Sequence, residues 1–149
     1  MQELHGYYLE DLEIGMSASY AKTISESDVY TFAGISGDNN PIHVNAEYAA
    51  TTMFKDRIVH GMFSAALIST VAGTRLPGPG AIYVDQEIKF KAPVYIGDTA
   101  KATLTVSEID ERRRRVKLKT DVTVGDKVVA TGFATLMVDR KPTEDTASE

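Results

Sequence analysis

The stretch Gly61-Met62-Phe63-Ser64-Ala65-Ala66-Leu67-Ile68-Ser69-Thr70-Val71-Ala72-Gly73 decides the fold. It carries no charged side chain, and its apolar residues fall on every side of a helix instead of along one stripe. A helix with this pattern is buried all round. Because the chain has only 149 residues, a sheet that curves around the helix is the arrangement able to bury it. The stretch therefore predicts a curved sheet wrapped around one long apolar helix.

Four strand-like runs follow this helix, with no helical segment between them. Strands that follow one another without crossover helices pair in antiparallel fashion. In the first run, apolar residues alternate with charged or polar ones, which is the period of a half-buried strand. We therefore predict a single α+β domain with one antiparallel sheet. Its expected strands are an early one at 17–24, then 81–91, 100–109, 113–124 and 127–139, with a tight hairpin at Gly125-Asp126.

Two short helices are expected between the first strand and the long helix. The first spans 26–35, where Ser25 and Asp28 can form a capping box and Gly37 can end the helix. The second spans 45–53 and begins at Asn45, a favourable capping residue. The residues between these helices are thus presented at the end of a helix.

Composition bounds the class of protein. Hydrophobic residues make up 43% and charged residues 25%, as in an ordinary globular domain, and the net charge of −5 argues against nucleic acid as a partner. The absence of cysteine excludes disulfides, thiolate metal sites and a cysteine nucleophile. The three histidines are scattered along the chain, so we expect no metal site. We see no signal peptide or membrane span, and expect a cytoplasmic protein.

The segment Gly37-Asp38-Asn39-Asn40-Pro41-Ile42-His43 carries the candidate chemistry. Pro41 fixes its own φ and biases Asn40 towards extended backbone, so the segment is stiff enough to aim Asp38 and His43 at one small volume. A carboxylate and an imidazole that share a water molecule can pass protons to and from it near neutral pH. The same residues are also good turn formers, so a plain loop is the alternative interpretation.

The wider pattern around this segment resembles the hydratase 2 signature of the MaoC-like (R)-specific enoyl-CoA hydratases. The resemblance runs through 32–43, Ala49-Ala50 and 58–62, and continues in 76–83, 90–94 and 97–98. It implies a hot-dog fold, a curved antiparallel sheet around a long helix, with 41–60 overhanging a substrate tunnel. It also implies hydration of trans-2-enoyl-CoA to (R)-3-hydroxyacyl-CoA or the reverse dehydration, for example of 3-hydroxybutyryl-CoA, with no cofactor.

The resemblance also implies roles for individual residues. Asp38 and His43 match the catalytic pair, and Gly61 matches the residue whose backbone N–H stabilises an oxyanion. Ser69 matches a helix serine that supports the catalytic loop in some members, and Asn40 is assigned with Gly61 and Ser69 to substrate binding. From the residues alone, Gly61 begins a helix, where free N–H groups favour anions. Close packing is its alternative role. Ser64 is expected to serve packing, and His60 to support its loop.

Three other functions remain open at this point. The first is an acyl-CoA thioesterase, since the resemblance implies a fold that thioesterases share, and a lone carboxylate suffices there. The second is a 3-hydroxyacyl dehydratase that acts on acyl carrier protein, and the third is a non-catalytic acyl-binding subunit.

The run Arg112–Arg115 could clamp the 3′-phosphate of coenzyme A, but acidic neighbours at 108, 110 and 111 favour a solvated strand start. The domain is expected at 1–140, with a disordered tail at 141–149. We expect a homodimer or higher homo-oligomer, because a sheet edge needs cover.

Overall fold

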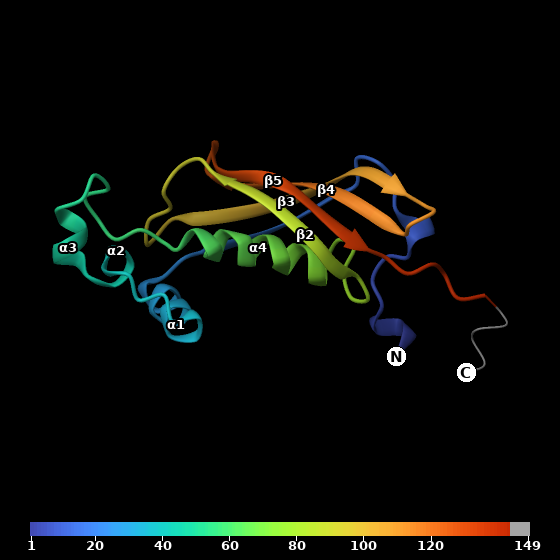
Figure 1. The fold of residues 1–149 in the computed structure, drawn as a ribbon, viewed down its shortest axis with the longest axis horizontal. Coiled ribbons are helices and arrows are strands. Elements are labelled where there is room, and N and C mark those ends of the chain that lie inside the picture. Colours follow the sequence, from blue (N-terminus) through green and yellow to red (C-terminus); the bar gives the residue numbers. More distant parts are fainter. Residues whose placement is uncertain (144–149) are drawn as a thin grey trace.

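The computed structural model describes residues 1–143. Its strands form one curved antiparallel sheet in the order β1-β3-β4-β5-β2 (Figure 1). The strands are β1 Ser17–Thr23, β2 Ile82–Phe90, β3 Thr99–Asp110, β4 Arg115–Val124 and β5 Lys127–Met137. Gly125, with φ of 58°, turns the chain between β4 and β5, as predicted. The predicted α+β class with one antiparallel sheet is confirmed, and the predicted strand limits agree with the observed ones within two residues.

The helices match the prediction with one omission. They are α1 Glu26–Ser36, α2 Pro41–Val44, α3 Ala46–Ala50 and α4 Gly61–Thr74, with single 3-10 turns at Gln2–Leu4 and Leu9–Asp11. The helix predicted at 45–53 is shorter and ends at Ala50, and α2 was not predicted. None of the helices in the described part of the chain is long and apolar enough to cross a membrane.

Helix α4 lies along one face of the sheet, beneath β3 and beside β1 and β4 (Figure 1). Its side chains Leu67, Ile68 and Val71 are buried against inward-facing leucines of the sheet, among them Leu104 and Leu118. The helix therefore holds the core together, because it supplies the apolar face that the sheet covers.

One side of α4 is uncovered, so the expectation of burial all round is wrong for the single chain. Besides its two end residues Gly61 and Thr74, the exposed residues of α4 are Met62, Ala66, Ser69 and Gly73, at spacings that place these four on one side of the helix. The physical reason is that the sheet wraps only part of the helix. We call these four residues the α4 stripe.

The edge strand β2 also exposes apolar side chains. Ile82, Val84 and Phe90 are between 48% and 55% exposed, and Met62 of the α4 stripe is 60% exposed. Uncovered apolar edges of this kind are templates for association with another chain.

The segment from α1 to α3 extends beyond the first turn of α4, at one end of the molecule (Figure 1). A capping box starts α1, since the Asp28 N–H donates to Ser25 Oγ at 3.1 Å and the Ser25 N–H donates to the Asp28 carboxylate at 3.0 Å. Gly37 ends α1 with φ of 80°, in the left-handed conformation that glycine adopts readily. The predicted overhang is thus present, held on a well-capped helix.

The opposite end of the molecule holds the N-terminus and the β3–β4 turn with Arg112–Arg115 (Figure 1). Arg113 pairs with Asp110 at 3.9 Å and Arg114 with Asp139 at 3.6 Å, which supports the solvated interpretation of this run. Lys141 pairs with Asp11 at 2.7 Å, so the first residue of the predicted tail is held on the domain. From residue 144 onwards, that tail lies outside the described residues.

Candidate active site

A short loop after α1 presents the Asp38 carboxylate. Ser36 Oγ donates to the Phe32 carbonyl at 2.7 Å and accepts from the Asp38 N–H at 3.2 Å, so the last turn of α1 fixes the start of the loop. The Asn40 N–H donates to Asp38 Oδ1 at 3.3 Å. Asp38 is exposed in the single chain, and its carboxylate keeps one oxygen free of these local bonds.

His43 is presented by α2, the one-turn helix that the sequence did not reveal. Asn40 caps this helix by accepting from the Ile42 N–H at 3.1 Å, and Pro41 occupies its first position. The side-chain oxygen of Asn40, a predicted substrate-binding residue, therefore caps α2. Helix α2 turns the His43 ring inward, where only 8% of the residue is exposed.

The surroundings of His43 fix which ring nitrogen is available. Its Nδ1 lies 2.7 Å from the Ile58 carbonyl oxygen, and because a carbonyl can only accept, Nδ1 carries the hydrogen. In the neutral ring Nε2 is then a free acceptor. Burial is the main cause that lowers the pKa of His43, and the charge of His60 lowers it further. The hydrogen bond to the Ile58 carbonyl and the charge of Asp38 raise this pKa in part. The neutral, proton-accepting form is thus favoured.

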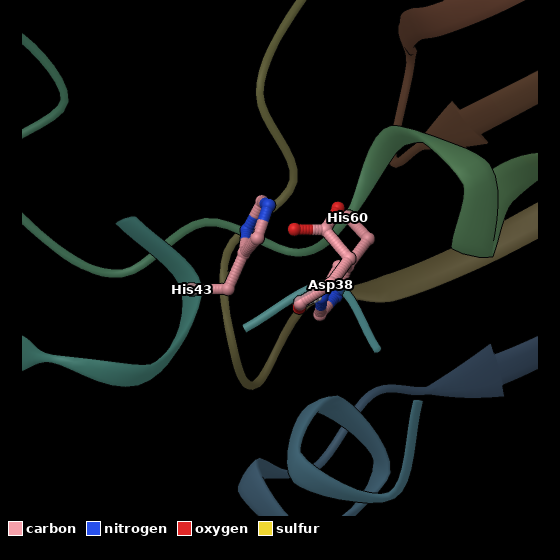
Figure 2. Close-up of side chains that lie close together, drawn as sticks. All are labelled: Asp38, His43 and His60. Carbon is pink, nitrogen blue, oxygen red and sulfur yellow. Dashed lines mark hydrogen bonds between the residues drawn. The ribbon is translucent and has the colours of Figure 1, made fainter. Parts of the chain in front are cut away.

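The structure brings three titratable side chains together. One polar atom each from Asp38, His43 and His60 lies within 4.8 Å of the other two (Figure 2). The predicted pair therefore shares one small volume. The His43 and His60 rings are stacked at 3.9 Å, so their in-plane lone pairs run side by side and do not converge on one point as metal ligands would. The cluster fits proton transfer better than metal binding.

Gly61 supplies a hydrogen-bond donor next to this cluster. It is the first residue of α4, and among the described residues no group accepts its N–H. A Cβ at this position would lie 2.9 Å from Phe90 Cε1, so any larger residue here requires the Phe90 ring to move. The start of a helix carries a partial positive charge as well as free N–H groups. Gly61 can therefore bind an oxygen atom that gains negative charge.

A cavity of about 390 Å³ opens beside Gly61. His60, Gly61 and Ser64 form the wall nearest the titratable cluster. The remaining walls are largely apolar and comprise Met53, Phe54, Ile58, Val59, Phe90, Lys91, Ala92, Pro93, Val94 and Val129. An apolar cavity with a few polar groups at one end suits an acyl chain whose reactive end meets those groups.

Comparison with known proteins agrees with this geometry. Residues 11–136 match the MaoC-like domain family. The chain belongs to the MaoC-like family. It is 61% identical over 132 residues to an (R)-specific enoyl-CoA hydratase of Rhodospirillum rubrum, covering 89% of this chain and 92% of that protein. It is 48% identical over 145 residues to a 3-hydroxybutyryl-CoA dehydratase of Methylorubrum extorquens, covering 97% and 92%.

A solved MaoC-like structure has the same architecture. An unliganded R-hydratase of Pseudomonas aeruginosa superposes with a TM-score of 0.87 at 44% identity, covering 93% of this chain and 89% of that one. The predicted hot-dog fold is thus confirmed.

The two serines of α4 differ in their surroundings. Ser64 is buried, as its expected packing role requires, and it also lines the cavity. Ser69, expected to support the catalytic loop, is exposed on the α4 stripe, two turns and about 12 Å along the helix from Gly61. Within one chain of this MaoC-like protein, Ser69 therefore does not reach the cluster.

His60 is the residue that sequence reasoning undervalued. It was expected only to support its loop, yet it contacts both members of the predicted catalytic pair and also lines the cavity. Its place directly before Gly61 was the available signal, since the N-cap residue of α4 must lie close to whatever the start of that helix binds.

Proposed function

We propose that this protein adds water to trans-2-enoyl-CoA to form (R)-3-hydroxyacyl-CoA, and catalyses the reverse dehydration. The observation that carries the proposal is the meeting of the Asp38 carboxylate and the His43 imidazole within 4.8 Å, beside the free N–H of Gly61. The names of the relatives support the reaction and the CoA thioester as substrate. No cofactor is needed, because the chain itself supplies an acid–base pair and an oxyanion donor.

Hydration of an enoyl thioester places three demands on the site. The thioester oxygen must be stabilised as it gains negative charge, water must lose a proton as it attacks C3, and C2 must receive a proton. The Gly61 N–H meets the first demand, and one such donor is typically worth about 10²–10³ in rate. Its position at the start of α4 lets the oxygen approach the backbone closely.

Asp38 and His43 meet the other two demands by sharing one water. As an O–H bond of this water breaks, the water oxygen bonds to C3 and the Asp38–His43 pair takes up the proton. The π electrons of the double bond move to C2 and the thioester oxygen. The pair then returns a proton to C2, so it ends the cycle in its starting state. Because both groups act from one side, the hydrogen and the hydroxyl add to the same face of the double bond.

We also propose that the working unit is a homodimer or a higher homo-oligomer. The edge strand β2 and the α4 stripe expose Ile82, Val84, Phe90 and Met62 on the single chain. Pairing of β2 with its copy would satisfy the free edge, and a second chain over the α4 stripe would complete the burial that the charge-free helix predicts. Ser69 would then lie at the interface. We expect this assembly in the cytoplasm, since a cysteine-free chain suits a reducing compartment.

The test is turnover of crotonyl-CoA, followed by loss of the enoyl absorbance, with Asp38→Asn assayed in parallel. We expect loss with the wild type only and a product that an (R)-specific 3-hydroxyacyl-CoA dehydrogenase oxidises while its (S)-specific counterpart does not. Release of free thiol without hydration would make the protein a thioesterase. Turnover of crotonyl-acyl carrier protein, but not of short or long enoyl-CoAs, would make acyl carrier protein the carrier. Absence of all these activities would refute an enzymatic role.

A further inference from the structure

His60 joins the three parts of the proposed site. It directly precedes Gly61, occupies the capping position of α4 and borders the cavity. Only 2% of the residue is exposed, which makes it the most deeply buried histidine in the chain. A histidine so placed moves with the oxyanion helix on one side and with the loop that carries Asp38 on the other.

The His60 ring contacts both members of the proposed catalytic pair, at the Asp38 backbone and at the His43 ring. Its Nε2–H donates to the backbone carbonyl of Asp38 at 2.8 Å. One face of the ring stacks on His43, the neighbour drawn with it in Figure 2, with centroids 3.9 Å apart and planes 26° apart. The ring also meets the Phe32 ring at 4.9 Å. A shift of His60 would therefore move the Asp38 backbone and the His43 ring together.

The second ring nitrogen of His60, Nδ1, argues against a role in packing alone. Because Nε2 carries the hydrogen, Nδ1 of the neutral ring is a bare acceptor, and it is buried without a partner among residues 1–143. Buried polar atoms without partners are uncommon and destabilising. A phenylalanine would stack equally well without this cost. An imidazole that costs stability in a wall of the site points to a functional requirement.

We infer that His60 is a positioning residue of the acid–base pair: through its bond to the Asp38 carbonyl and its stacking on His43 it sets the separation of the two groups from each other and from the Gly61 N–H. This inference rests on the proposed hydration. His60 itself transfers no proton and touches neither C2 nor C3. A misplacement of reacting groups by about 1 Å can cost about 100-fold in rate, so removal of this link has a measurable consequence.

Electrostatics add a second effect. The titratable groups that face His43 are Asp38, from the loop after α1, and His60, from the start of α4, while Ile58 contributes only its carbonyl. Burial is the main cause that lowers the pKa of His43, and a positive charge on His60 lowers it further. Replacement of His60 by an uncharged residue therefore raises the pKa of His43.

Two variants and one control separate positioning from simple loop support. His60→Phe keeps a ring against His43 but removes the donor to Asp38. His60→Gln keeps an N–H that can reach the Asp38 carbonyl but removes the ring and the charge. His5→Gln is the matched control, because His5 also stacks on an aromatic ring, Tyr8 at 4.0 Å, and is held in the N-terminal segment by its pair with Asp139.

We expect His60→Phe to lower kcat with crotonyl-CoA by about 10–100-fold, with KM changed far less and with no loss of thermal stability. His60→Gln should retain about tenfold more turnover than His60→Phe, because it restores the donor. In both variants, the limb of the pH–rate profile that reports His43 should move to higher pH. His5→Gln should leave kcat and the profile unchanged. Wild-type kcat in His60→Phe, or parallel losses of stability and activity with an unmoved profile, would overturn the inference.

A titration that does not depend on turnover keeps this inference distinct from the proposed function. The ring signals of the three histidines can be followed by NMR across pH, with that of His43 identified by its loss in His43→Gln. A higher pKa of His43 in His60→Gln, with no change in His5→Gln, is the expected result. An unchanged His43 titration would refute the inference even if the enzyme is active. If instead the wild type turns over no thioester, the proposed function fails, and the titration still decides whether His60 controls His43.

Discussion

Gly61→Ala is the substitution that most directly tests the oxyanion donor. The new methyl group would lie 2.9 Å from Phe90 Cε1 and 3.2 Å from Cδ1 and Cζ. Carbon atoms in good contact are about 3.5–4.0 Å apart, so the ring must move by about 0.5–1 Å. Phe90 is 52% exposed on an edge strand and can pivot, and alanine is the better helix former. The free energy of unfolding should therefore change by less than about 1 kcal/mol, or about 2–4 °C in Tm.

The effect on catalysis should be much larger. The backbone N–H stays, but the methyl group and the displaced Phe90 ring occupy the cavity beside it, so the thioester oxygen loses its approach to the donor. We expect kcat/KM with crotonyl-CoA to fall by about 10²–10³, or about 2.7–4 kcal/mol of transition-state stabilisation. The assay is loss of enoyl absorbance, with thermal unfolding measured on the same preparation.

Two further variants sharpen this test. In Gly34→Ala, on α1, the added methyl group meets nothing within 4 Å, so activity should be unchanged and stability should rise by about 0.5–1 kcal/mol. Gly61→Ala/Phe90→Leu relieves the contact with the ring. Recovery of activity there would show that the displaced ring does the damage. A stable Gly61→Ala protein with more than a tenth of wild-type kcat/KM would refute the argument that the thioester oxygen must approach the Gly61 N–H closely.

The remaining predictions concern the pair, its titration and the assembly. Asp38→Asn and His43→Gln should each lose about 10²–10⁴ in kcat, and the double variant little more, because the groups act as a unit; more than a tenth of wild-type activity in either would contradict this. Burial lowers the pKa of His43 in the folded protein below its ordinary 6.5, so the unfolded chain binds a proton at this histidine more tightly. The contribution of neutral His43 to folding stability is therefore present above pH 6.5 and is lost as pH falls through the lowered pKa. Denaturant unfolding at several pH values should show this slope in the wild type and less of it in His43→Gln. Ile82→Lys or Met62→Lys should yield folded monomers by light scattering, whereas unchanged assembly in both would place the interface elsewhere.

The fold could be predicted because its decisive features are local patterns. The charge-free run at 61–73 and the alternation at 81–91 set the helix and the first long strand, and the observed limits of α4 and β2 differ from them by at most one residue at each end. The exposure of the α4 stripe could not be predicted, because it depends on how far one chain's sheet reaches around the helix. The sequence encodes a helix that needs cover on every side, and a single chain provides only part of it.

The chemistry of the site was predictable to the extent that it lies on one segment. Asp38, His43 and Gly61 were the candidate residues, and the structure brings Asp38 and His43 together as expected. Helix α2 escaped prediction because one turn has no periodicity, although its cap at Asn40 and its first residue Pro41 are typical of a helix start. The stacking of His60 on His43 escaped it because ring contacts across a loop leave no trace in spacing.

The cavity walls and the catalytic segment come largely from different parts of the chain. Its walls come from three separate parts of the chain, the overhang and start of α4, the end of β2 with the following loop, and Val129 on β5. The acid–base pair depends instead on contacts within 36–60, where the Ile58 carbonyl and the His60 ring hold it. Substitutions at the end of β2 or on β5 can therefore reshape the space for the acyl chain without moving Asp38 or His43. The motif at 37–43 therefore predicts the reaction but not the length of the acyl chain.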